Sequence, residues 1–371
     1  MFNRKHTWFV LIVLLIGVLM LSGCGQTGET ADQKEPEVAN DSGSKSEDSI
    51  FYQPINARLA SEELEGDYMT YWAEQFAKDM NEWSDGQFNL DVYPFGALGE
   101  VRDINEMAQL GVVEYVFSDF AWISSFVPEA SVLGLHYIWP EQRIEEVMDW
   151  VVRNGEFMDI LEESYRREGL VPLSVMFEGW QWITSNKRIE TLEDMYGLDI
   201  RLMGSEMLQK QYLAYETSPT ALAYGEIYSG LQTGLIDAQA QPVFGNVSMK
   251  FYEVQDYMTQ IYAEPFVGIP TVNMQFFDSL PPEAQEKMRQ WWVDAIIPSA
   301  EWINEVNEEG LEFLEDKLEI IRVEGGDLKE FKEKGVTAHK EYFELGGPNA
   351  EKIYNALKKD IENAKVELGI E

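Results

Sequence analysis

The sequence predicts an α/β protein with room for two lobes, and three observations lead to this class. Segments with a period of two alternate with segments of helical spacing, as Ile55–Ala60 and Leu198–Leu202 illustrate. The chain has 371 residues, enough for two domains or one large one. Pro282–Ile321 keeps helical spacing for about 40 residues, with Pro298 as the expected kink. Such a helix is long enough to cross both halves of the fold.

The first 49 residues predict export and attachment rather than folded structure. Arg4 and Lys5 precede the apolar run Trp8–Leu21, whose 14 residues are fewer than the roughly 20 of a membrane-spanning helix. Leu21–Cys24 matches a bacterial lipoprotein box. We therefore expect a signal peptide over 1–23 and a lipid on Cys24, the alternative being an uncleaved anchor with an incidental cysteine. Residues 24–49 are polar and predict a disordered tether.

Charge and composition exclude several classes of function. The chain holds 28 Lys and Arg against 66 Asp and Glu, a formal charge of −38, so it would repel nucleic acid and anionic lipid. Its single cysteine, Cys24, allows no intramolecular disulfide. The three histidines, His6, His136 and His339, are too few for a His-rich metal site. We expect no metal, no cofactor and no nucleic-acid partner.

The folded part begins near Phe51, and its first half alternates strands and helices. A helix follows the capping candidates Asp67 and Thr70, and further helices start at Pro140. A loop over Ser118–Phe126 carries Trp122. The remaining expected elements are a helix over Val101–Leu110 and strands over Ile55–Ala60, Phe88–Tyr93, Val113–Phe117, Leu170–Met176 and, further along the chain, Ile269–Met274.

The stretch Leu198–Pro242 is the centre of the predicted site. Arg201 stands near the end of a strand, and Ser205 caps the helix that follows. After a second extended piece and a helix that stops at Gly234, another strand ends at Gln241. Ligands of open α/β sheets bind at strand ends, so this position brings a guanidinium and a carboxamide to a binding edge.

Three motifs in this chain resemble the solute-receptor subunit of TRAP transporters, the tripartite ATP-independent periplasmic systems. They are Tyr93–Glu100 (YPFGALGE), Ile200–Arg201, and Gly225–Gly234 (GEIYSGLQTG), and the resemblance covers roughly Ile55 to Ile361. The segment Ile236–Pro242 (IDAQAQP) departs from the family pattern, because alanine and glutamine replace its glutamate and asparagine. Gln181 stands where most members have an arginine.

The resemblance implies a two-lobed, class II-like periplasmic-binding-protein fold whose long kinked helix spans both lobes. Lobe I would contain 50–177, with about 265–300 returning to it. Lobe II would contain 178–264 and part of the C-terminal helices. The long spanning helix and the C-terminal helices would occupy 282–371. It also implies a receptor rather than an enzyme. Such a receptor is extracytoplasmic, here held by lipid on the outer face of the membrane, and delivers its solute to small and large permease subunits.

The resemblance also assigns the site. Arg201 would bind a carboxylate through two parallel hydrogen bonds, although its position alone favours an exposed arginine in a surface ion pair. Gln241 and Gln181 would lie near the same carboxylate. The ectoine-binding branch is the most similar, and it implies that Glu63 faces a delocalised cation between aromatic walls. The full predicted set is Arg201, Gln241, Glu63, Trp122, Tyr224, Phe244, Gln181, Trp180 and Asn273.

Two other readings are open at this point. One is a sugar- or peptide-binding receptor of an ATP-driven importer, although such a site would not need Arg201. The other, more remote, is a secreted glycosidase with two catalytic carboxylates, since acids and aromatic residues are abundant. The chain shows no distinctive catalytic motif. The leading prediction is therefore a receptor for a small organic carboxylate, ectoine-like or another monocarboxylate.

Overall fold

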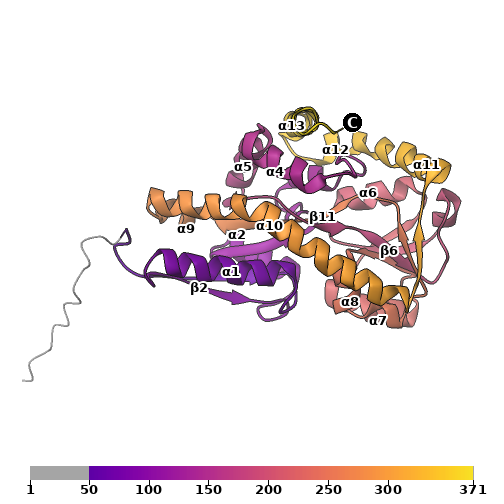
Figure 1. Cartoon of the computed structure of the whole chain (residues 1–371), viewed down its shortest axis with the longest axis horizontal. Helices are drawn as coiled ribbons and strands as arrows, with labels where there is room; N and C mark the ends of the chain where they lie inside the picture. The colour runs from indigo at the N-terminus through magenta and orange to yellow at the C-terminus, as the bar shows by residue number, and fades with distance from the viewer. Residues whose placement is uncertain (1–49, 371) are drawn as a thin grey trace, which may run out of the picture. The chain divides into compact units, whose positions relative to one another are not determined.

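The computed structural model describes residues 50–370, and its strands form two six-stranded sheets (Figure 1). In the first sheet the order is β2-β1-β3-β11-β4, with β5 paired to β11. β1 is parallel to β2 and β3, whereas β11 is antiparallel to β3, β4 and β5. Its strands are β1 (Ile55–Ser61), β2 (Phe88–Tyr93), β3 (Tyr115–Asp119), β4 (Leu170–Pro172), β5 (Met176–Trp180) and β11 (Pro265–Asn273).

The second sheet has the order β12-β10-β6-β9-β7-β8. β7 is parallel to β8 and β9, and β6 is antiparallel to β9 and β10. Its strands are β6 (Trp182–Ser185), β7 (Asp199–Leu202), β8 (Ser218–Ala221), β9 (Ala238–Gln241), β10 (Tyr257–Gln260) and β12 (Glu319–Arg322). The two sheets with their helices confirm the predicted two-lobed α/β class. Residues 50–370 belong to one compact unit, so the predicted lobe limits stay a prediction.

Helices cover both sheets because their apolar residues recur at helical spacing. In α1 (Tyr68–Trp83) the buried residues Met69, Ala73, Phe76 and Met80 lie on one face toward the core. The other α-helices are α2 (Val101–Gln109), α3 (Phe120–Ile123), α4 (Ile144–Asn154), α5 (Phe157–Arg167), α6 (Glu206–Ala214), α7 (Ile227–Thr233), α8 (Val243–Ser248), α9 (Met274–Ser279), α10 (Pro282–Glu315), α11 (Gly325–Gly335), α12 (His339–Leu345) and α13 (Ala350–Leu368). Short 3-10 turns occupy Pro128–Gly134, Leu192–Met195, Tyr224–Glu226, Phe251–Glu253 and Val336–Ala338.

The long helix α10 crosses from the first sheet to the second. It packs against β5, α1 and α4 and, further along, against α8 and β12 (Figure 1). Pro298 lies inside it, as predicted. The predicted end at Ile321 is wrong, because the helix stops at Glu315 and Glu319–Arg322 form β12. There the backbone N–H of Glu319 donates to the carbonyl of Asp256, so pairing with β10 replaces helical hydrogen bonds.

Other predicted element boundaries also differ from those in the structure. The expected loop Ser118–Phe126 contains α3, because the Asp119 carboxylate caps it by accepting from the N–H of Ala121 at 2.7 Å. The expected strand Leu170–Met176 is two strands, β4 and β5, and β11 starts at Pro265 rather than at Ile269. All nine residues of β11 are buried, so no alternation marks its first half.

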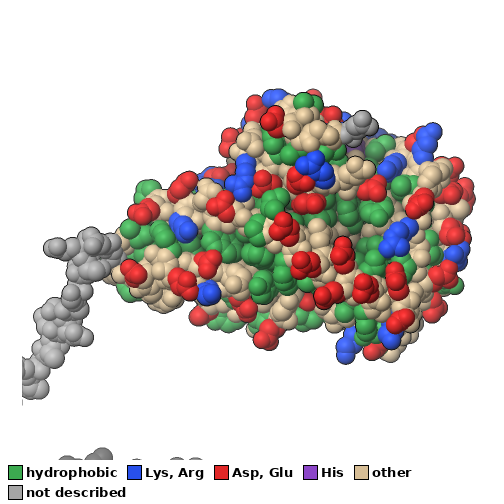
Figure 2. Space-filling view, in the orientation of Figure 1, with side chains coloured by type: hydrophobic (Ala, Val, Ile, Leu, Met, Phe, Trp, Pro, Cys, Tyr) green, Lys and Arg blue, Asp and Glu red, His purple; other side chains and the backbone are tan. Residues whose placement is uncertain are grey.

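Acidic side chains are spread over the face shown in Figure 2, among fewer basic ones, in line with the formal charge of −38. Within 50–370, no helix is long and apolar enough to cross a membrane. The segment with the predicted signal peptide, Cys24 and the tether lies outside the described residues. The chain passes between the two sheets three times, from β5 to β6, from β10 to β11 and along α10 to β12.

Candidate functional site

A small cavity lies where the two sheets meet, with an empty volume of about 290 Å³. The residues that line the cavity come from several elements. They lie just after β1, in α3, in and just after β7, after β8, in and after β9, and in β11. Six residues predicted from the sequence line it: Glu63, Trp122, Arg201, Tyr224, Gln241 and Phe244. The structure therefore brings most of the predicted set into one place.

Arg201 is the one basic residue that lines the cavity, and it is 1% exposed. Its Nε donates to the carbonyl of Leu222 at 2.9 Å, which fixes the plane of the guanidinium. Nη1 and Nη2 are buried without a hydrogen-bond partner. Burial lowers the pKa of Arg201 to about 10, although Tyr224, Glu62 and Asp119 favour its charge. Two buried donors with no acceptor are costly unless a ligand supplies the acceptor.

Glu63 presents an acceptor to the same cavity. It follows β1, and its Oε2 accepts from the N–H of Met69 in the first turn of α1 at 2.6 Å. Its Oε1 has no hydrogen-bond partner. Burial raises the pKa of Glu63 well above its ordinary value, as does the nearby Asp67, while the hydrogen bond from the N–H of Met69 acts in the opposite direction.

More carboxyl groups lie in and behind the cavity wall. Glu62 lines it and accepts from the Ser118 hydroxyl at 2.7 Å and from the N–H of Asp119 at 2.8 Å. Burial raises the pKa of Glu62 to about 7. Glu178 is fully buried behind Glu63. Acidic groups thus outnumber Arg201 around the cavity, which favours a ligand that carries positive charge as well as a carboxylate. Within 50–370, no cluster of three His, Cys, Asp or Glu fits a metal ion.

Aromatic rings form the remaining walls. Phe244 and Phe266 meet edge to face at 6.3 Å between centroids, and Tyr224 stacks edge to face on Phe95 at 5.3 Å. Trp122 lies so close to Gly204 that a Cβ there would come within 2.9 Å of the indole ring. The glycine after β7 therefore gives Trp122 its place over the cavity.

Contacts between segments of the two sheets enclose the cavity. Ser248 of α8 donates to Asp67, the N-cap of α1, at 2.7 Å. Ser124, after α3, donates to Ser205, the N-cap of α6, at 3.2 Å. Both pairs join residues more than 80 positions apart in the chain. A ligand inside this cavity would be held by both lobes at once.

Three predicted residues lie outside the cavity lining. Trp180 lines a separate groove behind β5. The side chain of Gln181 is buried and has no hydrogen-bond partner, but it does not line the cavity. Asn273 stands at the far end of β11, where it caps α9 through Phe276 and donates to the carbonyl of Ala108 at 2.9 Å. The structure gives Asn273 a capping role and places it outside the cavity lining.

Sequence reasoning missed Glu62, Met203 and Phe266 in the lining. Glu62 stands next to Glu63 at the end of β1, so the strand-end argument used for Arg201 applies to it equally. Phe266 lies in the half of β11 that was not predicted as a strand. Met203 follows directly after β7, and nothing in its type distinguishes it from a core residue.

Comparison with known proteins shows the family of the chain. Residues 59–345 match the model of bacterial extracellular solute-binding protein, family 7, also called DctP. The chain belongs to this family. The receptor is 29% identical to the ectoine-binding periplasmic protein TeaA of Halomonas elongata over 84% of this chain and 92% of TeaA. It is 28% identical to the ectoine/5-hydroxyectoine-binding protein UehA of Ruegeria pomeroyi, over 82% of this chain and 90% of UehA.

Solved structures match most of the described part of the receptor. The ectoine-binding protein of the TeaABC TRAP transporter superimposes with a TM-score of 0.78 at 29% identity, covering 83% of this chain and all of that one. A TRAP periplasmic protein from Desulfovibrio salexigens with bound orotic acid gives 0.79 at 24% identity, over 83% and 99%, and supports the fold alone. The receptor is thus a TRAP-type periplasmic solute-binding protein, a class that binds small molecules and works with membrane permease subunits.

Proposed function

We propose that the receptor binds a small zwitterion with one carboxylate and a delocalised cation, ectoine-like compatible solutes first, and delivers it to its permease subunits. The observation that carries the proposal is the pair of buried, unpartnered nitrogens Nη1 and Nη2 of Arg201. A carboxylate would accept from both in parallel, the geometry in which guanidinium binds most strongly. The names of the relatives TeaA and UehA point to the same ligand class.

The side of the cavity opposite Arg201 supports the proposal that the ligand also carries a cation. Glu63 offers its unpartnered Oε1, and the rings of Trp122, Tyr224 and Phe244 offer faces. A delocalised cation would gain on the order of 1 kcal/mol from each ring face. A second carboxylate placed 4 Å from Glu63 would instead meet a repulsion of about 4 kcal/mol at an effective dielectric of 20. The site therefore disfavours dicarboxylates.

Gln241 stands where the family pattern has an asparagine, at a position expected to contact the ligand carboxylate. It ends β9, lines the cavity beside Arg201 and is 4% exposed. Its amide would reach about one bond further than that of asparagine, so it favours a carboxylate held closer to Arg201. Among the described residues that line the cavity, Arg201 is the single guanidinium, which fits one carboxylate.

Competitive binding tests the ligand class. We expect ectoine or hydroxyectoine to bind the purified receptor more tightly than lactate, pyruvate, an aromatic monocarboxylate, succinate or malate, as measured by calorimetry. Proline serves as the control, because it is a zwitterion of similar size whose cation is not delocalised. Tight binding of succinate or malate, without measurable binding of any monocarboxylate, would overturn the proposed ligand class. The assignment to the family would be unaffected.

We also propose that lipid on Cys24 holds the receptor at the outer face of the membrane. The box Leu21–Cys24 and the polar segment 25–49 motivate this. In a bacterial host fed a labelled fatty acid, wild type should carry the label and Cys24→Ala should not, and the variant precursor should stay uncleaved by the lipoprotein peptidase. Equal labelling of the two proteins would refute the attachment.

A further inference from the structure

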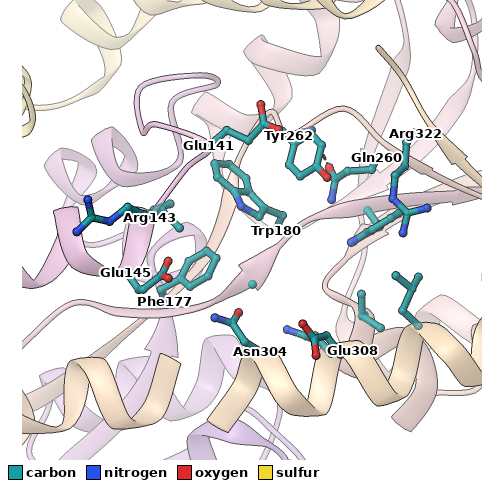
Figure 3. Close-up of a pocket in the computed structure, with 16 residues that line it drawn as sticks. Glu141, Arg143, Glu145, Phe177, Trp180, Gln260, Tyr262, Asn304, Glu308 and Arg322 are labelled. Carbon is teal, nitrogen blue, oxygen red and sulfur yellow. Dashed lines mark hydrogen bonds between the residues drawn. The ribbon is translucent and has the colours of Figure 1, made fainter. Parts of the chain in front are cut away.

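A second concave site lies behind the ligand cavity, with an empty volume of about 980 Å³ (Figure 3). It contains Trp180, which the sequence singled out and the ligand cavity did not use. Each of the three connections between the sheets contributes to it: Trp180 and Trp182 from β5 and β6, Gln260 and Tyr262 from β10 and its exit, and Glu308 from α10. We call this site the hinge groove.

The hinge groove is distinct from the ligand cavity but only one layer away. Asn307 of α10 donates from Nδ2 to the carbonyl of Glu178 at 3.2 Å, and its Oδ1 accepts from the N–H of Phe244 at 3.0 Å. Phe244 lines the ligand cavity, whereas its neighbour Val243 lines the hinge groove. The two sites therefore occupy opposite sides of the same backbone.

Aromatic rings and carboxylates dominate the wall of the hinge groove. Trp180 meets Tyr262 edge to face, with centroids 5.8 Å apart at 82°, and meets Phe177 at 6.2 Å. Figure 3 shows the Trp180 ring in the middle of the groove, with Glu141 on one side and Glu308 across it on α10. Glu141 is already paired with Lys332 at 3.7 Å, whereas Glu308 leaves a carboxylate that, together with the aromatic face, can attract an organic cation.

The basic residues of the groove are already engaged. Arg143 is held by Glu146 and donates to the carbonyl of Leu368 at 2.8 Å, so its guanidinium points away from Trp180 (Figure 3). Arg322 lies over the ring of Trp182 at 5.6 Å. Glu308 forms no ion pair with another residue of the described range. The side of the groove next to α10 thus keeps a carboxylate without a counter-ion.

Gln260 adds a donor that has no acceptor. Its side chain is 0% exposed and lines the groove. Its Oε1 accepts from the N–H of Tyr262 at 2.6 Å, which fixes the orientation of the amide, and Nε2 is left without a partner. A buried amide N–H normally finds an acceptor, so the ligand that fits here brings an oxygen as well as a positive charge.

We propose that the hinge groove binds a small organic ammonium ion that carries a hydroxyl group. The ammonium group lies on the face of Trp180 near Glu308, and the hydroxyl oxygen accepts from Nε2 of Gln260. Because the groove is built from the segments that connect the two sheets, its occupant also restrains those segments. This site is independent of the solute that the Arg201 cavity takes.

Choline and its neutral isostere 3,3-dimethyl-1-butanol test the proposal, because the two have the same shape and differ in charge. The titration uses the purified receptor with no other solute, so its outcome does not depend on the ligand of the Arg201 cavity. We expect choline to bind at least about tenfold more tightly, since each 1.4 kcal/mol is a factor of ten. In hydrogen exchange, choline should slow the amides of 180–182 and 260–264. Equal binding of the two probes, or no binding of choline, overturns the site.

Single substitutions test whether choline binds in the hinge groove. Trp180→Leu keeps apolar bulk but removes the π face, and Glu308→Gln keeps shape but removes charge. Each should weaken choline binding by about threefold or more. Glu312→Gln is the matched control, because Glu312 is exposed on the same helix and does not line the groove. Choline binding that is unaltered in Glu308→Gln and Trp180→Leu, or equally weakened in Glu312→Gln, contradicts the assignment.

Discussion

Replacing Arg201 with methionine is expected to weaken binding of the receptor's carboxylate ligand by at least about thirtyfold, corresponding to 2 kcal/mol or more. Methionine keeps the volume but removes both donors that stand ready at Nη1 and Nη2. The ligand carboxylate would then be buried without a partner, which costs more than the hydrogen bonds themselves are worth. Calorimetric titration of the tightest-binding compound of the competition panel measures the loss.

Two further substitutions show whether charge or geometry matters. Arg201→Lys keeps the positive charge but presents a single point donor, so its affinity should fall between wild type and Arg201→Met. Arg188→Ala removes an arginine from a surface ion pair with Glu190 and Glu319 and should leave binding nearly unchanged. An Arg201→Met receptor that binds within about threefold of wild type would show that the carboxylate anchor lies elsewhere.

The sequence predicted the part of the site that strand ends determine. Arg201 and Gln241 were placed together because their strands, β7 and β9, run parallel and finish at one edge of the second sheet. Glu63 follows β1, a parallel strand of the first sheet, by the same reasoning. Period-two alternation and turn residues are local signals, so they can be recognised in the sequence without knowledge of the tertiary contacts.

Other features depended on tertiary contacts that no local pattern contains. Trp180 and Gln181 were assigned from their place beside a family motif, but β5 turns the indole to the back of the sheet. The segment that became β12 has helical spacing and forms a strand only because β10 lies beside it. No role was predicted from the sequence for Glu178, which follows the expected strand Leu170–Met176. Its burial behind Glu63 depends on Gly268 of β11, where a Cβ would lie 2.2 Å from its Oε1.

Glu63 and Glu178 form the most unusual feature of the folded receptor, two neighbouring carboxyl groups that are both buried, with neither oxygen of Glu178 hydrogen-bonded to another described residue. Two buried carboxylates at close range repel each other, so the pair favours keeping one proton. Burial raises the pKa of Glu178 well above its ordinary value, and Glu63 adds to this effect by charge repulsion. The acids that face the pair are Asp67 from the start of α1, Glu62 from the end of β1 and Asp119 from β3. We infer that Glu178 is the protonated partner.

This pair should make the ligand-free receptor less stable as pH rises. The folded chain keeps the Glu178 proton above pH 4.5, the ordinary pKa of the group, whereas the unfolded chain releases it there. The free energy of unfolding therefore falls from about pH 4.5 upward, until the raised pKa of the folded state is passed. One proton contributes at most about 1.4 kcal/mol per pH unit to this slope. Urea unfolding of the ligand-free receptor between pH 5 and 8 measures it.

Glu178→Gln isolates the contribution of the pair. The carboxamide has nearly the same size and is always neutral, with no proton to lose, so the fall in stability with pH should become shallower by up to one proton. The slope should not vanish, because burial also raises the pKa of Glu62 to about 7 and that of Asp119 above its ordinary value. Glu301→Gln, an exposed change on α10, should leave the wild-type slope intact. Parallel pH profiles for Glu178→Gln and wild type would mean that Glu178 is not the residue that holds the shared proton.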